Sequence, residues 1–407
     1  MMRKTITLVL FFVAFAAGLT TMAQNHFDFI VEQEKKLSDA IEIGKILNNL
    51  KSRIAPDKRV AIWEDVRCLN AIDLHVPLIS GTVGYQWQKD SISAELDKFN
   101  VEYQNSVKVL ANMVPAEKEW AIVKLSIATL RCDPKHSGEV ATQCVMGTPL
   151  RVIEEVGEWL RVQCPDDYIA YVPESSVKFL TQQELDAWKN TERYIVTVYD
   201  DQLVSKPKGD ETVSDLVLGN ILQVKSKKGK WIELATPDCR TGWVKTSSVE
   251  KFDKWAQQNI DLNKIEKTAR RMMGSGYLWG GTSTKVTDCS GLVKVSYFSN
   301  GIILQRDASQ QALTGKKIAD WHDAQLCDLL FFGNSTTGRV THVGLYLRDG
   351  KYIHCSGQVK INDLNPDAPD YLYSPLSISR INGMIGTKGI KYVRDHEWYF
   401  FWSIKCY

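Results

Sequence analysis

The sequence Asp288-Cys289-Ser290-Gly291-Leu292-Val293 follows a turn-rich stretch, Tyr277-Leu278-Trp279-Gly280-Gly281-Thr282-Ser283. Because residues 290–298 have helical apolar spacing, we expect Cys289 at a loop-to-helix junction, near the positive end of the helix dipole. That position favours the thiolate, which is the nucleophilic form of cysteine. Taken alone, a cysteine at a helix start is also compatible with an ordinary buried residue.

Two histidines downstream favour the catalytic interpretation. His342 begins an apolar strand-like run, and His354 lies in Tyr352-Ile353-His354-Cys355. The turn signal Asp349-Gly350 between them predicts a hairpin that can place both imidazoles on one face. A thiol nucleophile requires a base, and the base requires a group that holds its ring. A lone strand histidine is ordinarily a core residue, but a cysteine with two hairpin histidines indicates a site for nucleophilic catalysis.

Five motifs surround these residues: Tyr277-Leu278-Trp279-Gly280-Gly281, Asp288-Cys289-Ser290-Gly291, Arg306-Asp307-Ala308-Ser309-Gln310, Asp328-Leu329-Leu330-Phe331-Phe332-Gly333 and Thr341-His342-Val343-Gly344. With these motifs, residues 253–407 resemble the NlpC-type cysteine peptidases of bacterial cell walls. The resemblance implies a circularly permuted papain-like fold, with Cys289 as nucleophile, His342 as base and His354 as the orienting residue. Cys327 departs from the family pattern, which has glycine there, and we expect it to affect a turn and not the chemistry.

Two stretches upstream share one pattern. Residues 119–182 and 191–252 each contain a glycine turn, an alternating strand, a Trp-containing strand and an aromatic-Val strand, with Tyr171 where the second copy has Trp243. Short strands at this spacing indicate small barrels, and the repetition indicates two copies. The copies resemble bacterial SH3 domains. A polar helix is expected between them, over residues 181–190.

The remaining segments complete an α+β chain. Residues 24–118 are expected to form an N-terminal helical and α+β module. Its helix covers 27–54, with Ile30, Leu37, Ile41 and Leu47 near one side and an interruption at Gly44. We expect strands at 60–63, 74–79 and 107–110, a helix at 91–99, and Gly81 near a turn. In the last domain, we expect a helix at 265–273 and strands at 329–332, 343–347, 352–354 and 398–404.

Residues 1–23 have the features of a secretory signal peptide. Arg3 and Lys4 precede the apolar run 6–19, and small residues follow at the expected cleavage site. The alternative is a membrane anchor, but the run is short for a span of about 20 residues. No cysteine lies at the junction, so lipidation there is not expected. We therefore expect export to the periplasm or the extracellular space, without stable membrane insertion after cleavage.

Composition limits the partners and cofactors. The 407 residues include 50 Lys and Arg against 48 Asp and Glu, and without Arg3 and Lys4 the counts are equal. Such a balance gives no reason to expect a nucleic-acid partner. The nine cysteines have irregular spacing without a CxxC pair, and the seven histidines are scattered, so we expect no metal site and no cofactor. The cysteine pairing is left open, and we expect a monomer.

The order of two SH3-like units and a peptidase domain resembles, more specifically, the γ-D-glutamyl-L-diamino acid endopeptidases of the dipeptidyl-peptidase VI type. The resemblance implies cleavage after γ-D-Glu in murein peptides with a free N-terminal L-Ala. It also implies substrate contacts from seven residues: Tyr277, Asp288, Ser290, Asp307, Ser309, Glu139 and Tyr168. A cationic amine favours carboxylate partners, and a wall behind it excludes longer chains.

Other interpretations stay open at this stage. Glu139 and Tyr168 match by local context only, and they are equally compatible with a solvated charge and a barrel aromatic. Asp307 is also compatible with a helix cap, which could coexist with a substrate role. The whole chain could be a peptidoglycan-binding SH3 protein with a degenerate catalytic domain, or an amidase or acyltransferase on the same fold, because a fold does not fix a reaction. The preferred diamino acid is left open.

Overall fold

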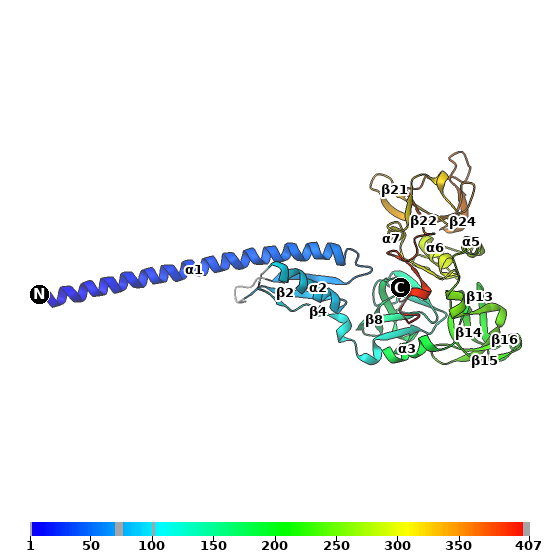
Figure 1. Ribbon diagram of the computed structural model, residues 1–407, viewed down its shortest axis with the longest axis horizontal. Coiled ribbons are helices and arrows are strands. Elements are labelled where there is room, and N and C mark those ends of the chain that lie inside the picture. Colours follow the sequence, from blue (N-terminus) through cyan, green and yellow to red (C-terminus); the bar gives the residue numbers. More distant parts are fainter. Residues whose placement is uncertain (1, 70–75, 100–101, 402–407) are drawn as a thin grey trace, which may run out of the picture. The chain divides into compact units, whose positions relative to one another are not determined.

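The computed structural model describes residues 2–69, 76–99 and 102–401, with side chains described from residue 20 onward. The chain divides into two compact units, Met1–Met113 and Val114–Tyr407. Figure 1 labels the main helices and strands of both units. Among the residues whose side chains are described, from residue 20 onward, no helix has the length and the apolar character needed to cross a membrane.

The first unit begins with a single helix, α1 (Met2–Ile54). It includes the stretch that we expect to be a signal peptide, and it runs without a break through Gly44, around which there is open space. The buried residues of α1 lie near its end, at Ile43, Ile46, Leu47 and Leu50. The helix predicted from the apolar spacing is confirmed, but Ile30, Leu37 and Ile41 are exposed, because only the last turns of α1 are covered.

A small sheet and a second helix cover those last turns. The sheet contains β1 (Trp63–Leu69), β2 (Leu78–Val83), β3 (Gln104–Asn105) and β4 (Lys108–Val109), and α2 spans Gln86–Leu96 before a short 3-10 turn, η1 (Asp97–Phe99). The predicted strand at 60–63 only begins at Trp63, and residues 74–75 lie outside the described residues. Gly81 is inside β2 and not at a turn: its φ is +130°, opposite a bulge at Asp65, where a Cβ would meet the Val66 backbone at 2.5 Å.

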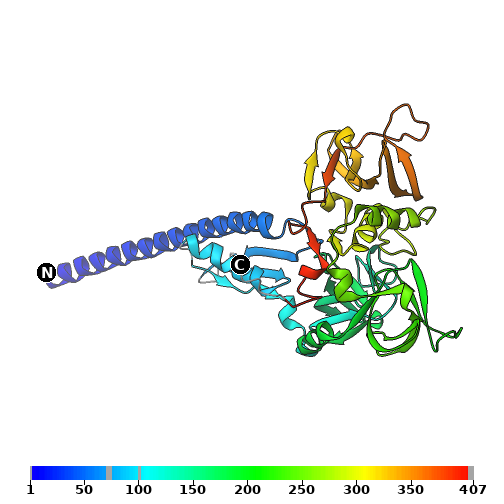
Figure 2. The same ribbon diagram turned by 45° about the vertical axis from the view of Figure 1, so that its right-hand side comes forward.

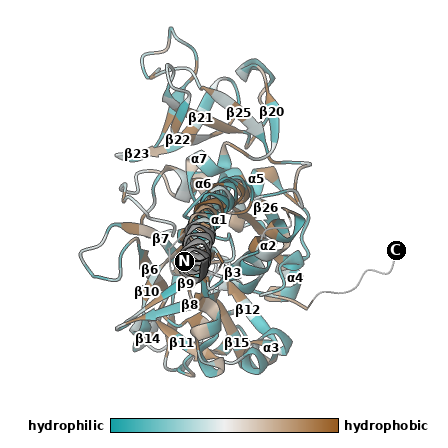
Figure 3. Ribbon diagram, turned by 90° about the vertical axis from the view of Figure 1, so that its left-hand side faces the viewer, coloured by the Kyte–Doolittle hydropathy of each residue, from teal (hydrophilic) through white to brown (hydrophobic). Residues whose placement is uncertain are grey.

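The second unit starts with two seven-stranded antiparallel sheets. The first contains β5 (Trp120–Val123), β6 (Ile127–Arg131), β7 (Val140–Val145), β8 (Pro149–Val156), β9 (Trp159–Gln163), β10 (Ile169–Pro173) and β11 (Val177–Leu180). The second contains β12 (Arg193–Val196), β13 (Asp200–Val204), β14 (Thr212–Val217), β15 (Ile221–Lys228), β16 (Trp231–Ala235), β17 (Thr241–Lys245) and β18 (Val249–Lys251). In Figure 3 their strands mix hydrophobic and hydrophilic residues.

The two sheets have the same topology. The first has the order β11-β5-β8-β9-β10-β6-β7, and the second has β18-β12-β15-β16-β17-β13-β14. The internal repeat expected from the sequence is confirmed by this order. Tyr171 faces Arg161 as Trp243 faces Glu233, so the two aromatics are equivalent. The polar helix between the copies is α3 (Gln182–Asn190), which the Thr181 side chain caps by accepting from the Glu184 N–H.

The last part of the chain contains a six-stranded antiparallel sheet and the helices beside it. The sheet order is β20 (Lys316–Ile318), β25 (Ser377–Arg380), β21 (Leu329–Asn334), β22 (Arg339–Tyr346), β23 (Lys351–Ser356) and β24 (Gln358–Asp363). The helices are α4 (Phe252–Ala256), α5 (Leu262–Arg271), α6 (Cys289–Phe298) and α7 (Ala308–Gln311), and β19 (Ile302–Leu304) pairs with β26 (Ile390–Tyr392). Helix α6 lies between this sheet and the two seven-stranded sheets (Figures 1 and 2).

The core of this part joins α6 to the sheet. Leu292 and Val293 of α6 share one buried cluster with Val343 and Leu345 of β22 and with Ile353 of β23. Burial of an aliphatic side chain stabilises a fold by about 1.5–3 kcal/mol, so this packing fixes the start of α6 against β22. Cys289 begins α6, His342 lies in β22 and His354 lies in β23, so this packing brings together the elements that carry the three candidate catalytic residues.

Two details of this part differ from or extend the expectations. The strand predicted at 398–404 is wrong for residues 398–401, which belong to no strand, because Trp398 packs edge-on against Trp120 at 5.2 Å and Tyr399 is buried with Phe252. Residues 402–404 lie outside the described residues. Cys327 has a φ of +67° and is fully buried. The left-handed conformation explains why glycine suits this position, and it confirms that the change affects a turn.

Candidate active site

Cys289 is the first residue of α6, and Asp288 is its N-cap. The Asp288 Oδ1 atom accepts from the Gly291 N–H at 2.7 Å, which satisfies one of the donors that a helix start leaves free. Gly291 allows a close approach, because a Cβ there would lie 2.0 Å from the Gly281 carbonyl oxygen. The Asp-Cys-Ser-Gly motif thus forms a capped helix start that is packed directly against the preceding loop.

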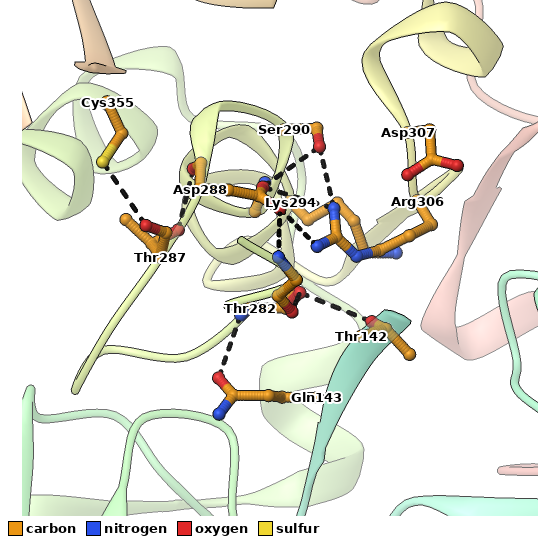
Figure 4. Close-up of polar contacts among 12 residues, drawn as sticks. Thr142, Gln143, Thr282, Thr287, Asp288, Ser290, Lys294, Arg306, Asp307 and Cys355 are labelled. Atoms are coloured by element: carbon orange, nitrogen blue, oxygen red, sulfur yellow. Dashed lines mark hydrogen bonds and ion pairs between the residues drawn. The ribbon is translucent and has the colours of Figure 1, made fainter. Parts of the chain in front are cut away.

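The Asp288 carboxylate has further partners within the protein. Its Oδ2 atom accepts from the Gly280 N–H at 3.0 Å and pairs with Arg306 Nη2 at 2.5 Å, while Arg306 Nη1 donates to Ser290 Oγ at 2.8 Å (Figure 4). Asp288, Ser290 and Arg306 are 5%, 4% and 1% exposed. The sequence predicts substrate contacts for Asp288 and Ser290. The structure shows that both also hold the loop and the helix start together.

Cys289 is buried, with 7% of the residue exposed. Burial, followed by the neighbouring Asp288 charge, raises the pKa of Cys289 to about 11, although the N–H groups of Val343 and Ser290 and the Arg306 charge act in the opposite direction. The expectation that the helix dipole favours the thiolate is therefore wrong for the resting site, because desolvation outweighs the dipole. The contact with the Val343 N–H places the sulfur beside the residue that follows His342.

His342 and His354 are in direct contact. The His342 Nε2 atom lies 2.7 Å from His354 Nδ1, and the two rings are 4.9 Å apart at 78°. In the β22–β23 register His354 faces Gly344, so the two imidazoles are diagonal neighbours on one face. Asp349 and Gly350 form the hairpin turn with φ values of +52° and +76°. The hairpin and the pairing predicted from the sequence are both confirmed.

Both imidazoles are neutral at neutral pH. Burial, and then the proximity of His354, lower the pKa of His342 to about 4, while the Asp288 carboxylate has a weaker opposite effect. Burial also lowers the pKa of His354, although a hydrogen bond from its ring to Asn362 acts against this. The site therefore combines a neutral thiol with a neutral imidazole pair, and proton transfer must accompany attack by the sulfur.

Tyr277 lies in the loop before α6. Its N–H donates to the Gly357 carbonyl at 2.9 Å, and 37% of the residue is exposed. The pKa of the Tyr277 phenol is raised, first by burial and then by the charges of Cys289 and Asp288. The phenol is thus close to the candidate nucleophile while part of the side chain faces solvent.

A second group of candidate residues lies where the first seven-stranded sheet meets α7. The Tyr168 hydroxyl donates to the Asp307 Oδ2 atom at 3.2 Å. Asp307 occupies the N-cap position of α7, and its N–H donates to Gln310 Oε1 at 3.0 Å. Asp307 also lies near Arg306 (Figure 4). Burial by itself lowers the pKa of Arg306, but the carboxylates of Asp288 and then Asp307 raise it by a larger amount. The net effect is a pKa above the usual arginine value, so the guanidinium stays charged.

Comparison with known proteins assigns two parts of this chain to families. Residues 274–374 match the NlpC/P60 family, and residues 130–177 match the bacterial dipeptidyl-peptidase Sh3 domain. The chain carries a bacterial SH3 domain followed in sequence by an NlpC/P60 cysteine peptidase domain.

Relatives and a solved structure agree with this assignment. The chain is 29% identical over 265 residues to dipeptidyl-peptidase 6 of Lysinibacillus sphaericus, covering 62% of this chain and 94% of that protein. It is 28% identical over 222 residues to the gamma-D-glutamyl-L-lysine dipeptidyl-peptidase of Bacillus subtilis, covering 53% and 72%. The crystal structure of an NlpC/P60 family protein from Bacillus cereus superposes with a TM-score of 0.57 at 22% identity, covering 64% of this chain and 99% of that one. That structure supports the fold.

Contacts from α6 and from the C-terminal segment hold the SH3 loop that carries Tyr168. Lys294 of α6 forms an ion pair with Asp166, Lys391 pairs with Asp167 at 3.0 Å, and a ring nitrogen of His396 lies 2.9 Å from the Pro165 carbonyl. The Asp166–Lys294 pair is 7% and 13% exposed. Since α6 also carries Cys289, one helix connects the nucleophile to the SH3 loop.

A second set of contacts joins the SH3 domain to the loop before α6. Gln143 Oε1 accepts from the Thr282 N–H and from the Ser283 hydroxyl, both at 3.0 Å, and Thr142 Oγ1 lies 3.4 Å from Thr282 Oγ1 (Figure 4). Gly280, with a φ of +81°, rests on the Val140 backbone, where a Cβ would lie 2.4 Å from the carbonyl oxygen. The nucleophile loop is therefore packed directly on β7.

The other two predicted substrate residues are less tightly placed. Glu139 is exposed and directly precedes Val140, so its backbone lies next to the Gly280 contact. Ser309 is half-buried in the first turn of α7. The structure thus brings Tyr168 to Asp307 and leaves Glu139 at the edge of the same region.

Two further residues, which the sequence motifs do not mark as functional, contact candidate site residues directly. Arg306 belongs to the Arg306-Asp307-Ala308-Ser309-Gln310 motif. Its role could have been inferred from sequence, because a buried Asp288 carboxylate requires a cationic partner. Asn362 of β24 has an Oδ1 atom 2.7 Å from His354 Nε2. It lies in no motif that the sequence singled out, and only strand pairing brings it to the site.

Proposed function

We propose that this protein hydrolyses the bond between γ-D-Glu and the diamino acid in short peptidoglycan peptides that carry a free N-terminal L-Ala. The names of the relatives support the bond, because two of them are described as gamma-D-glutamyl-L-lysine dipeptidyl-peptidases. The Tyr168–Asp307 contact carries the proposal, because it closes the SH3 domain over the site beside a carboxylate.

In the proposed mechanism, the sulfur of Cys289 attacks the γ-glutamyl carbonyl carbon while His342 takes the thiol proton. The tetrahedral intermediate collapses to a thioester as the imidazolium of His342 returns the proton to the leaving amine. Water then attacks the thioester with His342 as base, releasing the dipeptide and the thiol. The Cys289 N–H at the start of α6 is the candidate donor to the oxyanion. His354 keeps the His342 ring in place.

The neutral resting state supports this order of events. With a Cys289 pKa of about 11 and a His342 pKa of about 4, the free thiolate–imidazolium pair is disfavoured in the empty site. Proton transfer to His342 is thus coupled to bond formation with the substrate. The thiol also reacts less readily with other electrophiles before a substrate is bound, because the thiolate is the nucleophile.

Selection of the free amine is assigned to the region where the two domains meet. An ammonium group is stabilised by carboxylates and by acceptor hydroxyls, and Asp307 with Tyr168 supplies one of each. Glu139 is proposed as a second carboxylate for the ammonium group, at the edge of the region where the two domains meet. The SH3 loop blocks extension beyond the amino terminus, so intact glycan-linked stems are expected to be poor substrates.

The finer fold and the location of the protein are also part of the proposal. The family resemblance supports a circularly permuted papain-like fold for residues 253–407, with α6 packed on the six-stranded sheet. The signal-peptide features of residues 1–23 support export to the periplasm or beyond. Amino-terminal sequencing of the protein purified from its natural host tests the second point, and an uncleaved Met1 would contradict it.

The function is tested with a purified murein tripeptide, L-Ala-γ-D-Glu-diamino acid. The native protein should release L-Ala-γ-D-Glu, and Cys289→Ala should fold with the same circular dichroism spectrum and release none. Full activity in Cys289→Ala would remove the proposed nucleophile. Tight binding to insoluble peptidoglycan without peptide release would favour the binding-protein alternative, and transfer of the dipeptide to an added amine or glycerol would favour an acyltransferase.

A further inference from the structure

Asn362 connects the histidine pair to the loop that follows β24. It lies in β24 opposite Tyr352 of β23 and is 5% exposed. Its Oδ1 atom is 2.7 Å from His354 Nε2, and its Nδ2 group donates to the Asp370 carbonyl. These two contacts use opposite ends of the amide. They also form the far end of a chain that continues through His354 to His342.

The direction of every hydrogen bond in this chain follows from chemistry. A backbone carbonyl only accepts, so the NH₂ end of Asn362 faces Asp370 and the oxygen end faces His354. The amide oxygen also only accepts, so His354 Nε2 carries its proton. A neutral imidazole has one N–H, so His354 Nδ1 is an acceptor, and the proton of the 2.7 Å contact belongs to His342 Nε2. His342 Nδ1 is then the nitrogen without a proton.

That outcome matters because the base must have a free lone pair. In the opposite tautomer, His342 Nδ1 carries the proton and cannot accept one from Cys289. Without an acceptor at the Asn362 position, His354 could carry its proton on Nδ1, and it would then require an acceptor nitrogen at His342 Nε2. The proton would then sit on Nδ1 instead of Nε2 in both imidazoles. The neutral forms of both rings make the choice of tautomer decisive.

We propose that Asn362, held by the Asp370 carbonyl, is a positioning residue that sets the tautomers of His354 and His342 and keeps His342 Nδ1 free to act as base. This inference rests on the proposed catalytic roles of Cys289 and His342. It adds a fourth member to the site, one that acts only through His354. It also joins the base to the backbone of the loop between β24 and β25.

The charged and titratable groups that face the pair are few among the described residues. Asp288 at the start of α6 favours the imidazolium of His342, whereas Lys360 of β24, which faces His354 in the strand pairing, disfavours the charged form of both rings. The Tyr352 ring lies 4.9 Å from that of His354. None of these groups bonds to His354 Nε2, so the assignment of that proton depends on Asn362.

The direct test is a ¹H–¹⁵N NMR spectrum of the imidazole nitrogens in the full-length protein at neutral pH. We expect both His342 and His354 to carry the proton on Nε2 in the native protein and in Cys289→Ala. In Asn362→Leu, we expect His354 and His342 to shift toward the Nδ1–H forms. A native His342 with its proton on Nδ1 would overturn the inference whether or not any variant folds.

Kinetics provide a second test with matched variants. Asn362→Leu should lower kcat by roughly ten- to hundredfold, as for other residues that orient an imidazole, with KM within about twofold. Asn362→Asp keeps the acceptor and the tautomer but adds a negative charge, so it should retain more activity than Asn362→Leu and shift the acid limb of kcat/KM to higher pH. Asn382→Leu, at an exposed position in the loop after β25, is the control and should match the native protein.

The outcomes separate this inference from the proposed function. If Asn362→Leu keeps native kcat and native tautomers, the inference fails while the peptidase proposal stands. If Cys289→Ala remains active, the catalytic assignment fails, and the tautomers measured by NMR still decide whether Asn362 sets them.

Discussion

The Tyr168 hydroxyl donates to the Asp307 carboxylate at 3.2 Å, and the two residues are 139 positions apart in the chain. Tyr168 comes from the turn between β9 and β10 of the SH3 domain, and Asp307 caps the short helix α7 of the peptidase domain. The second seven-stranded sheet has the same turn with Arg240 at the position of Tyr168, held by Asp238 of its own turn. One repeated turn is therefore used for substrate recognition in the proposed function, whereas in the other copy it makes structural contacts, because Arg240 also donates to the carbonyls of Val213 and Lys124.

The first prediction concerns this contact. Tyr168→Phe should raise KM for a peptide with a free amino terminus by roughly tenfold, because a hydrogen bond to a charged group contributes about 1.5–3 kcal/mol. Its kcat should change little, since Tyr168 does not contact the reacting atoms in the proposed mechanism. Steady-state kinetics check this, with Tyr171→Phe in the next strand as control. An unchanged KM would mean that Tyr168 is only a barrel aromatic.

The packing of the nucleophile loop on the SH3 domain gives a second prediction. Gly280→Ala places a Cβ 2.4 Å from the Val140 carbonyl oxygen, whereas Gly274→Ala, at nearly the same φ, meets open space. Both variants have a similar backbone cost of about 1 kcal/mol. Only Gly280→Ala should also lose activity, by at least tenfold, because Gly280 donates to Asp288. Equal activities in the two variants would show that the domain contact does not affect the site.

The third prediction concerns the buried pair between Lys294 and Asp166. Removing one partner leaves a buried charge without compensation, which costs about 3–5 kcal/mol. Lys294→Met should therefore lower the free energy of unfolding by several kcal/mol in urea titrations. Lys254→Met removes a pair with Glu250 in which the lysine is 78% exposed, and it should cost less than about 1 kcal/mol. Similar losses in the two variants would contradict the structural role given to Lys294.

The pH dependence of kcat/KM follows from the neutral histidine pair. Burial lowers the pKa of His342 to about 4. The base is thus unprotonated above that value and protonated below it, so activity should hold from neutral pH down to about pH 5 and then fall. An alkaline limb is expected near pH 8, where the free α-amine of the substrate loses its proton. An acid limb near pH 6.5, the usual histidine value, would contradict the buried, neutral base.

Much of the site could be predicted from sequence because its parts are local. The Asp-Cys-Ser-Gly motif contains its own cap and close-packing glycine, and Asp349-Gly350 determines a hairpin that pairs His342 with His354. Arg306 and Asn362 could not be assigned in the same way, because their roles depend on polar groups that only tertiary packing brings together. The expectation that the helix start favours the Cys289 thiolate was wrong for a related reason. The helix start is visible in the sequence, but the burial that outweighs its effect on the pKa is not.

The same distinction applies to the fold. The repeat of two sheets was visible because each copy has its own turns and alternating strands. The helix α1 was visible as well, but the exposure of Ile30, Leu37 and Ile41 was not, because apolar spacing does not show which turns of a helix have a packing partner. The terminal strand was wrong because Trp398 and Tyr399 pack as individual anchors in an aromatic cluster and not as members of a sheet.

The most direct test of the account is mass analysis of the products from two matched peptides, L-Ala-γ-D-Glu-meso-diaminopimelate and the same peptide acetylated on its amino terminus. We predict that the native protein releases L-Ala-γ-D-Glu from the free peptide and cleaves the acetylated peptide at least a hundredfold more slowly. Cleavage of both peptides at similar rates, or cleavage at a different bond, would contradict a dipeptidyl-peptidase that recognises the free amine through Asp307 and Tyr168.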